Sequence, residues 1–204
     1  MNQLIALFLV GVFCLSATVQ ANEKADVDSA LNQLFKQLEI TQGVANFTQK
    51  KYFAFLSTPI TSQGTLKVHK GSIIWQVEKP VFSKLMIVQD QVWQLKSEKD
   101  KSPARYQQIV SHAGVETLIR AIFTGKVSPS QWKITLENAL CLQLVPNDSL
   151  LLQAISSLSL CLTENKKQRH VIINDAQNNR TEIEINITAY SLLDDDIREF
   201  NLNK

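Results

Sequence analysis

The feature that most constrains the fold is a succession of short segments in which apolar and polar residues alternate. About ten such segments follow one another at regular spacing, separated by turn residues such as Lys70-Gly71 and by Pro80. Alternation with a period of two is typical of strands that bury one face, and short regular spacing indicates antiparallel neighbours. The chain is therefore expected to form one large antiparallel sheet, which at that size must curl or split.

Two further segments have helical periodicity instead. Residues 26–38 and 111–124 carry apolar side chains three or four positions apart, and Gly125 ends the second segment. Each predicted helix has a single apolar stripe that must be covered. The simplest arrangement is an α+β fold in which both helices lie over the concave face of a strongly curved sheet of about ten strands.

The N-terminus has the profile of a secretory signal peptide. Residues 4–19 form an apolar run without charge, Val19-Gln20-Ala21 is a small-residue cleavage pattern, and charge begins at Glu23. We expect residues 1–21 to be a signal peptide removed after Ala21, and residues 22–204 to form a single domain. The alternative is an uncleaved membrane anchor.

Two cysteines, Cys141 and Cys161, remain after removal of the expected signal peptide. Each lies in an alternating segment rich in leucine. If these segments pair antiparallel about residue 151, Leu142 faces Leu160 and Cys141 faces Cys161. Outside the cytoplasm such a pair favours a disulfide. Two buried free thiols that lie out of register are the alternative.

The residue types that could catalyse a reaction or bind a metal do not form a recognisable catalytic or metal-binding motif. The histidines at positions 69, 112 and 170 share no metal-binding spacing, and the chain has neither a Gly-x-Ser-x-Gly motif nor a glycine-rich phosphate loop. The acidic run Asp194–Asp196 lacks the spacing of a calcium loop and is expected to be a solvated turn. We therefore expect no enzyme activity, no metal site and no cofactor.

The net charge and the apolar content limit the kinds of binding partner that the chain is expected to have. A formal net charge of +2 without a basic block gives no electrostatic footprint for nucleic acid. Apolar residues are abundant on the predicted strands, and two interpretations stay open. All of them form an ordinary core, or part of the interior is an incompletely filled pocket that takes an acyl chain.

Eight short motifs, in their order and spacing, resemble the periplasmic outer-membrane lipoprotein carrier (LolA-like) family, and the match covers nearly the whole mature chain. They are Phe47-Thr48-Gln49-Lys50, Gly64-x-Leu66-x-Val68, Trp75-x-x-x-x-Pro80, Asp90-x-Val92-Trp93, Trp132-x-Ile134, Leu144-x-Pro146-x-Asp148, Leu158-x-Leu160 and Thr181-x-Ile183. The resemblance implies an incomplete antiparallel β-barrel with helices as a lid over an apolar cavity. It also implies a monomeric periplasmic carrier that takes acylated lipoprotein or lipid cargo from an inner-membrane donor complex to an outer-membrane acceptor.

On this resemblance we expect a set of large apolar residues to face the lipid-binding cavity. They are Phe47, Leu66, Val68, Trp75, Leu85, Ile87, Trp93, Leu118, Ile122, Leu142 and Leu160.

The sequence also departs from the family pattern. Lys70 is expected to contact the lid at the place where the well-known carrier has an arginine, and a lysine lacks the planar fork that holds several carbonyls at once. The chain stops soon after Phe200, so the long C-terminal extension of that carrier is expected to be missing. These departures leave a glycolipid or an aryl-polyene-type lipid open as cargo beside a lipoprotein. A protein-binding or sensor module on the same fold, with no transported cargo, is the alternative function.

Overall fold

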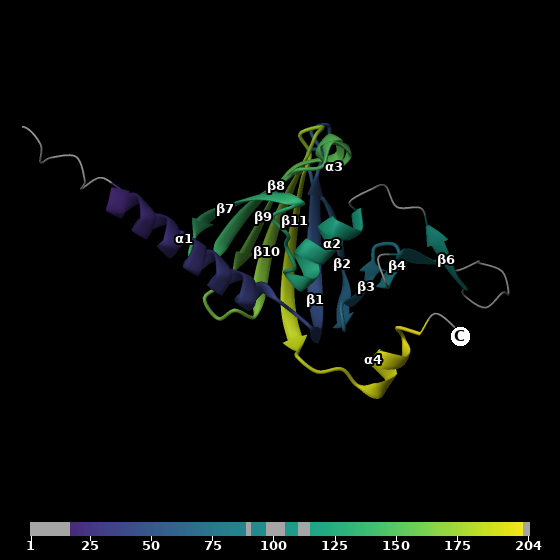
Figure 1. The fold of residues 1–204 in the computed structure, drawn as a ribbon. Coiled ribbons are helices and arrows are strands. Elements are labelled where there is room, and N and C mark those ends of the chain that lie inside the picture. The colour runs from purple at the N-terminus through teal and green to yellow at the C-terminus, as the bar shows by residue number, and fades with distance from the viewer. Residues whose placement is uncertain (1–16, 89–90, 97–104, 110–114, 202–204) are drawn as a thin grey trace, which may run out of the picture.

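The alternating segments form the antiparallel strands of one curved sheet in a computed structural model, which describes residues 17–88, 91–96, 105–109 and 115–201 (Figure 1). Within these residues the strands are β1 (Gln42–Tyr52), β2 (Ile60–His69), β3 (Ser72–Lys79), β4 (Ser83–Val88), β5 (Gln91–Lys96), β6 (Arg105–Ile109), β7 (Trp132–Asn138), β8 (Cys141–Pro146), β9 (Ile155–Leu162), β10 (Gln168–Asp175) and β11 (Arg180–Ala189). The helices there are α1 (Ala17–Leu38), α2 (Val115–Thr124), α3 (Ser149–Ala154) and α4 (Asp194–Arg198).

The sheet consists of two meanders, β1 to β6 and β7 to β11, which are joined where the first strand of one pairs with the last strand of the other. Its strand order is β6-β5-β4-β3-β2-β1-β11-β10-β9-β8-β7, so β1 pairs with β11 and the two edges are β6 and β7. In the ladder that the structure describes these edges do not pair, and the barrel is incomplete. Helix α2 lies between the edge strands in the chain and crosses over the sheet (Figure 1). The expected α+β fold, an unclosed curved antiparallel sheet with helices over one face, is confirmed.

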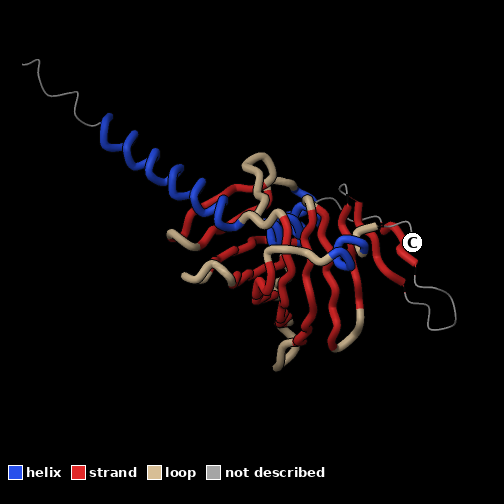
Figure 2. Tube along the Cα trace, turned by 90° about the horizontal axis from the view of Figure 1, so that it is seen from below, coloured by secondary structure: helices blue, strands red, loops and turns tan. Residues whose placement is uncertain are grey.

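The main core lies between the concave face of the sheet and the helices α1 and α2. Leu66 and Val68 of β2 are each 1% exposed, and they belong to one buried cluster with Leu38 of α1 and Phe123 of α2. Figure 2 shows the strands side by side along the curved sheet, with the N-terminal part of α1 projecting away from it. The apolar side chains of α2 and of residues 31–38 of α1 are thus covered by the sheet.

The opposite face of β2 to β4 is covered by the C-terminal segment. The Nζ atom of Lys67 lies 2.6 Å from an oxygen of Asp196, and the two carboxylate oxygens of Glu199 lie 2.5 Å from Lys67 Nζ and 2.6 Å from Lys84 Nζ. The ring of Phe200 lies 5.6 Å from that of His69. The acidic run expected to be a solvated turn is therefore the start of α4, a helix held to the sheet by ion pairs.

The other differences from the sequence predictions are local. Strand β6 was not predicted, because Arg105-Tyr-Gln-Gln-Ile109 has no apolar alternation. Residues 1–16 of the expected signal peptide lie outside the described residues, and α1 begins at Ala17, before the expected cleavage point. Among the helices that are described, none is long and apolar enough to cross a membrane.

Candidate functional site

The two helices over the concave face meet at their C-terminal ends. We call residues 31–38 of α1 together with α2 the lid. The backbone N–H of Ile40, just after α1, donates to the carbonyl oxygen of Thr124 at the end of α2, over 2.9 Å. Gly125 has φ +69°, and a Cβ atom there would lie 2.2 Å from the carbonyl oxygen of Leu38. Only glycine allows this close approach, which fixes where the two helices meet.

Arg169 of β10 is hydrogen-bonded to both helices of the lid. Its Nη1 atom donates to the carbonyl oxygens of Ile122 and Phe123 over 3.3 and 3.2 Å, and its Nη2 atom donates to that of Leu38. These are carbonyls of the last turns of α2 and α1, which have no acceptor role inside their own helix and carry the negative end of the helix dipole. One guanidinium therefore joins both helices to the sheet.

The surroundings of Arg169 are apolar. The residue is 1% exposed, and its neighbours across the strands are Leu162 and Ile185, which are also buried. Burial lowers the pKa of Arg169 to about 10, against a smaller opposite effect of Tyr190, so the side chain stays charged at neutral pH. Hydrogen bonds from a charged group contribute about 1.5–3 kcal/mol each. Loss of the lid carbonyls would thus leave a costly unpaired charge.

An aromatic cluster lies in the same interior and links the sheet to the lid. The ring of Trp75 on β3 lies 5.8 Å from that of Phe47 on β1, edge to face, and 5.4 Å from that of Phe123 on α2. Phe123 therefore touches Trp75 through its ring while its carbonyl accepts from Arg169. Trp75 Nε1 is buried and has no hydrogen-bond partner among the residues that the structure describes.

Ten of the residues predicted to face a cavity do lie together on the concave face or on α2. Seven are buried in the main cluster: Phe47, Leu66, Val68, Ile87, Ile122, Leu142 and Leu160. Trp75 and Leu118 are partly buried against it, and Leu85 lies opposite Trp75 in the sheet. Lid side chains such as Leu34 and Phe123 belong to the same buried cluster, so the structure shows a closed form.

Trp93 was predicted to face the same cavity, and this is wrong. It lies opposite Met86, which in turn lies opposite Ile74, and that row is on the face covered by α4. Its neighbour Val92 lies opposite Ile87 and is the residue of β5 that faces the concave side. A difference of one position along a strand moves a side chain to the other face.

Lys70 was predicted to contact the lid, and the structure places this contact elsewhere. Lys70 and Gly71 form the two-residue turn between β2 and β3 with φ of 48° and 80°, and the Lys70 side chain is exposed. The carbonyl oxygen of Gly71 instead accepts from Nη1 of Arg120 on α2 over 2.5 Å. The forked cation beneath the lid is Arg169, a residue that the sequence analysis did not select.

The signal for Arg169 is present in the sequence. In Arg169-His-Val-Ile-Ile173 the arginine is in phase with Val171 and Ile173, which puts a cation at a position of the buried face. Buried charges are retained where they are paired, so such a break in an apolar row marks a site.

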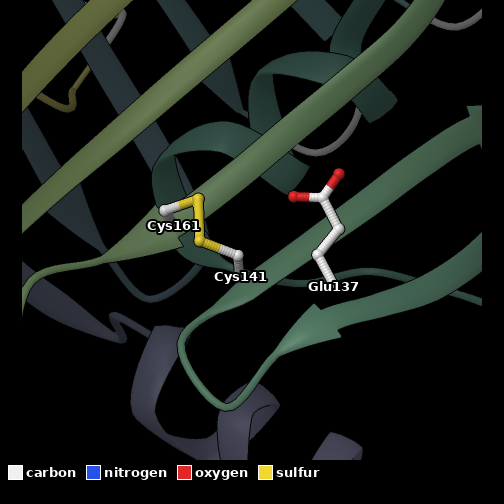
Figure 3. Close-up of side chains that lie close together, drawn as sticks. All are labelled: Glu137, Cys141 and Cys161. Atoms are coloured by element: carbon white, nitrogen blue, oxygen red, sulfur yellow. A yellow bond between two sulfur atoms is a disulfide. The ribbon is translucent and has the colours of Figure 1, made fainter.

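The two cysteines form a disulfide, and the predicted register of β8 and β9 is confirmed. Cys141 lies opposite Cys161, Leu142 opposite Leu160, and the disulfide joins the two strands over 20 positions. A carboxylate oxygen of Glu137 lies within 4.8 Å of both sulfur atoms (Figure 3). Sulfurs joined in a disulfide are not the thiolates that bind metals, so we assign no metal site here.

Two grooves lie on other surfaces. One of about 810 Å³ runs over the outer side of the lid and is lined by both lid helices, for example by Lys36 and Glu116. The other, of about 550 Å³, runs over the face of β1, β11 and β10 that carries Asn46, His170 and Glu184. Both are lined largely by polar side chains.

The fold and the site define an open antiparallel half-barrel with a helical lid fastened by a buried arginine. No family model and no curated protein matches the chain. Among solved structures, the fold is similar to a LolA superfamily protein from Nitrosomonas europaea, with 8% identity, a TM-score of 0.45, and coverage of 83% of this chain and 96% of that one. It is also similar to a protein described as an outer membrane lipoprotein-sorting protein domain from Vibrio parahaemolyticus, with 11% identity, a TM-score of 0.34, and coverage of 88% and 99%.

Proposed function

We propose that the chain is a carrier that binds acyl chains of a lipid or lipoprotein between the concave face of its sheet and the lid. The observation that supports this most is the way the lid is attached. A continuous apolar surface is covered by two helices, and Arg169 joins both of them to the sheet through three carbonyls. A cover of this kind can separate from the sheet as a unit without breaking any strand pair.

The free energies of opening and of cargo burial are of similar size. Opening exposes the four large apolar side chains of the lid that are at most 3% exposed, namely Leu34, Leu38, Ile122 and Phe123. At ~1.5–3 kcal/mol for each buried side chain this costs about 6–12 kcal/mol. An acyl chain of about sixteen carbons gains ~0.8 kcal/mol per buried CH₂, or about 13 kcal/mol in all. A near balance allows cargo to enter and also to leave.

The proposed location, partners and cargo rest on the sequence analysis. Residues 1–21 act as a cleaved signal peptide, and the remaining chain works in the periplasm as a monomer without a catalytic role. It receives cargo from an inner-membrane donor complex and delivers it to an outer-membrane acceptor. The cargo is a lipoprotein, a glycolipid or an aryl-polyene-type lipid.

A fluorescent fatty-acid probe tests the proposal directly. The purified mature protein is expected to bind the probe and to release it when an extract of membrane lipids is added. Mass spectrometry of lipids that copurify from the native host then identifies the cargo. No probe binding, together with purification of a protein partner and no lipid, would contradict a carrier and favour the protein-binding module.

A further inference from the structure

Within the described residues, the guanidinium of Arg169 donates all its hydrogen bonds to the lid. Its partners are carbonyls of Leu38, Ile122 and Phe123, while the third nitrogen of the group, Nε, is buried without a partner in the described chain. The residues beside it in the sheet, Leu162 and Ile185, offer only apolar side chains. The sheet itself thus provides no side-chain counter-charge to Arg169 on these flanking strands.

Opening of the lid, as required by the proposed function, therefore removes every carbonyl partner that the described chain gives Arg169, and an acyl chain that then covers the concave face keeps water away from the cation. A buried charge without partners is strongly destabilised, whereas a charge that gains new partners is not. The acyl chain of the cargo cannot compensate, because it has no acceptor. Some group of the cargo with oxygen acceptors must take the place of the helix carbonyls, or the guanidinium stays without partners beneath the bound acyl chain.

The geometry of the donors selects the kind of group. A guanidinium presents its N–H groups in a planar fork that matches two oxygens of a carboxylate or phosphate, and such a pair adds the attraction between opposite charges to the hydrogen bonds. A second donor lies in the same interior, since the indole Nε1 of Trp75 is buried without a partner. Trp75 is connected to Arg169 through Phe123, whose ring contacts the indole and whose carbonyl accepts from the guanidinium.

We propose that Arg169 is the binding site for an anionic head group of the cargo, a carboxylate or a phosphate at the head of an acyl chain. The anion replaces the three helix carbonyls when the lid opens. The same side chain thus holds the lid closed in the empty carrier and selects the head group of the cargo. This inference rests on the proposed function and adds the chemical class of the ligand to it.

The test compares three ligands that share a palmitoyl chain and differ in the head. Palmitate carries a carboxylate, palmitoyl lysophosphatidic acid carries a phosphate, and monopalmitoylglycerol is neutral. Calorimetry with the mature protein is expected to give at least one anionic ligand a Kd about tenfold or more below that of the neutral one. The two anionic arms show whether a carboxylate or a phosphate is preferred.

Variants assign the preference to Arg169. In Arg169→Met the anionic and neutral ligands are expected to bind alike, whereas Arg169→Lys keeps the charge but loses the fork and retains only part of the preference. The exposed Arg180, changed to Met, is the matched control and should keep the full preference. The ratio in the unmodified protein needs no variant, so equal binding of the anionic and neutral ligands overturns the proposal even if Arg169→Met does not fold, and Arg169→Lys then assigns any preference to this position.

The outcomes separate the two proposals. Equal binding of all three ligands by the unmodified protein, or a preference that survives in Arg169→Met, overturns the anionic site but leaves an acyl carrier. Binding of none of them overturns the carrier and the anionic site together.

Discussion

Arg169 and Gly125 act at the same point of the molecule, where α1 and α2 end. Arg169 supplies the charge that holds the helix carbonyls, and Gly125 supplies the space that brings the helices together. A buried cation is stable here because two helix C-termini point their negative ends at it. At the scale of single residues, the closed lid depends on these two positions.

Gly125→Ala should destabilise the protein much more than Gly71→Ala. Both glycines have positive φ, +69° and +80°, so each alanine has the cost of a left-handed conformation, roughly 1–2 kcal/mol. At Gly125 the added Cβ also meets the Leu38 carbonyl oxygen at 2.2 Å, whereas at Gly71 the nearest atom is 3.9 Å away. Such crowding adds about 1–3 kcal/mol.

Urea unfolding of both variants measures this difference. Equal losses of unfolding free energy would show that the junction of α1 and α2 yields to a methyl group, and that the lid is not held there.

Strands β8 and β9 show how well a local pattern can specify an element. Their leucines alternate on both sides of a short connection that contains α3, so the register that pairs Leu142 with Leu160 also pairs Cys141 with Cys161. Such a register needs no information from the rest of the chain. The disulfide adds a constraint on the unfolded state to a pairing that the apolar faces already favour.

Replacement of both Cys141 and Cys161 by serine should lower stability by about 3 kcal/mol, the chain-entropy value for a loop of this length. The sequence separation of the two residues is 20. Thermal and urea unfolding of the variant, beside the reduced unmodified protein, provide the measurement. If reduction of the unmodified protein changes nothing, the cysteines are not bridged in solution.

Helix α4 is attached by charges, and its attachment should depend on pH. Burial alone would raise the pKa of Glu199, but hydrogen bonds from Lys67 and Lys84 outweigh it and hold that pKa below its ordinary value. The hydrogen bond from Lys67 likewise lowers the pKa of Asp196. The folded state thus binds fewer protons than the unfolded state, so this stabilisation is present at neutral pH and is lost as the pH falls through about 4.

Glu199→Gln should therefore reduce the free energy of unfolding at pH 7, by roughly 1 kcal/mol after solvent screening, and should have little effect at about pH 3. Asp194→Asn, an exposed change at the first residue of α4, is the control and should have little effect at either pH. A cost of Glu199→Gln that is the same at both pH values would mean that charge does not hold α4.

For the whole molecule, the sequence predicted more of the fold than of the candidate site. Alternation and turn residues sufficed for every described strand except β6, and helical spacing sufficed for the lid helices. The face of Trp93 could not be fixed in this way, because it depends on a single position of register between β4 and β5. The role of Arg169 depends on two helices that are distant in sequence, and that of α4 on Lys67 and Lys84.

The opposite faces of Trp75 and Trp93 allow a direct test of the central proposal, that an acyl chain enters between the concave face and the lid. A dibrominated stearate quenches tryptophan fluorescence on contact. Two variants, each with Trp132 and one further tryptophan changed to phenylalanine, keep either Trp75 or Trp93 as their single tryptophan. We expect strong quenching of Trp75, which contacts Phe47 and Phe123 beneath the lid, and little quenching of Trp93. Equal quenching of both, or none of Trp75, would contradict an acyl-binding interior.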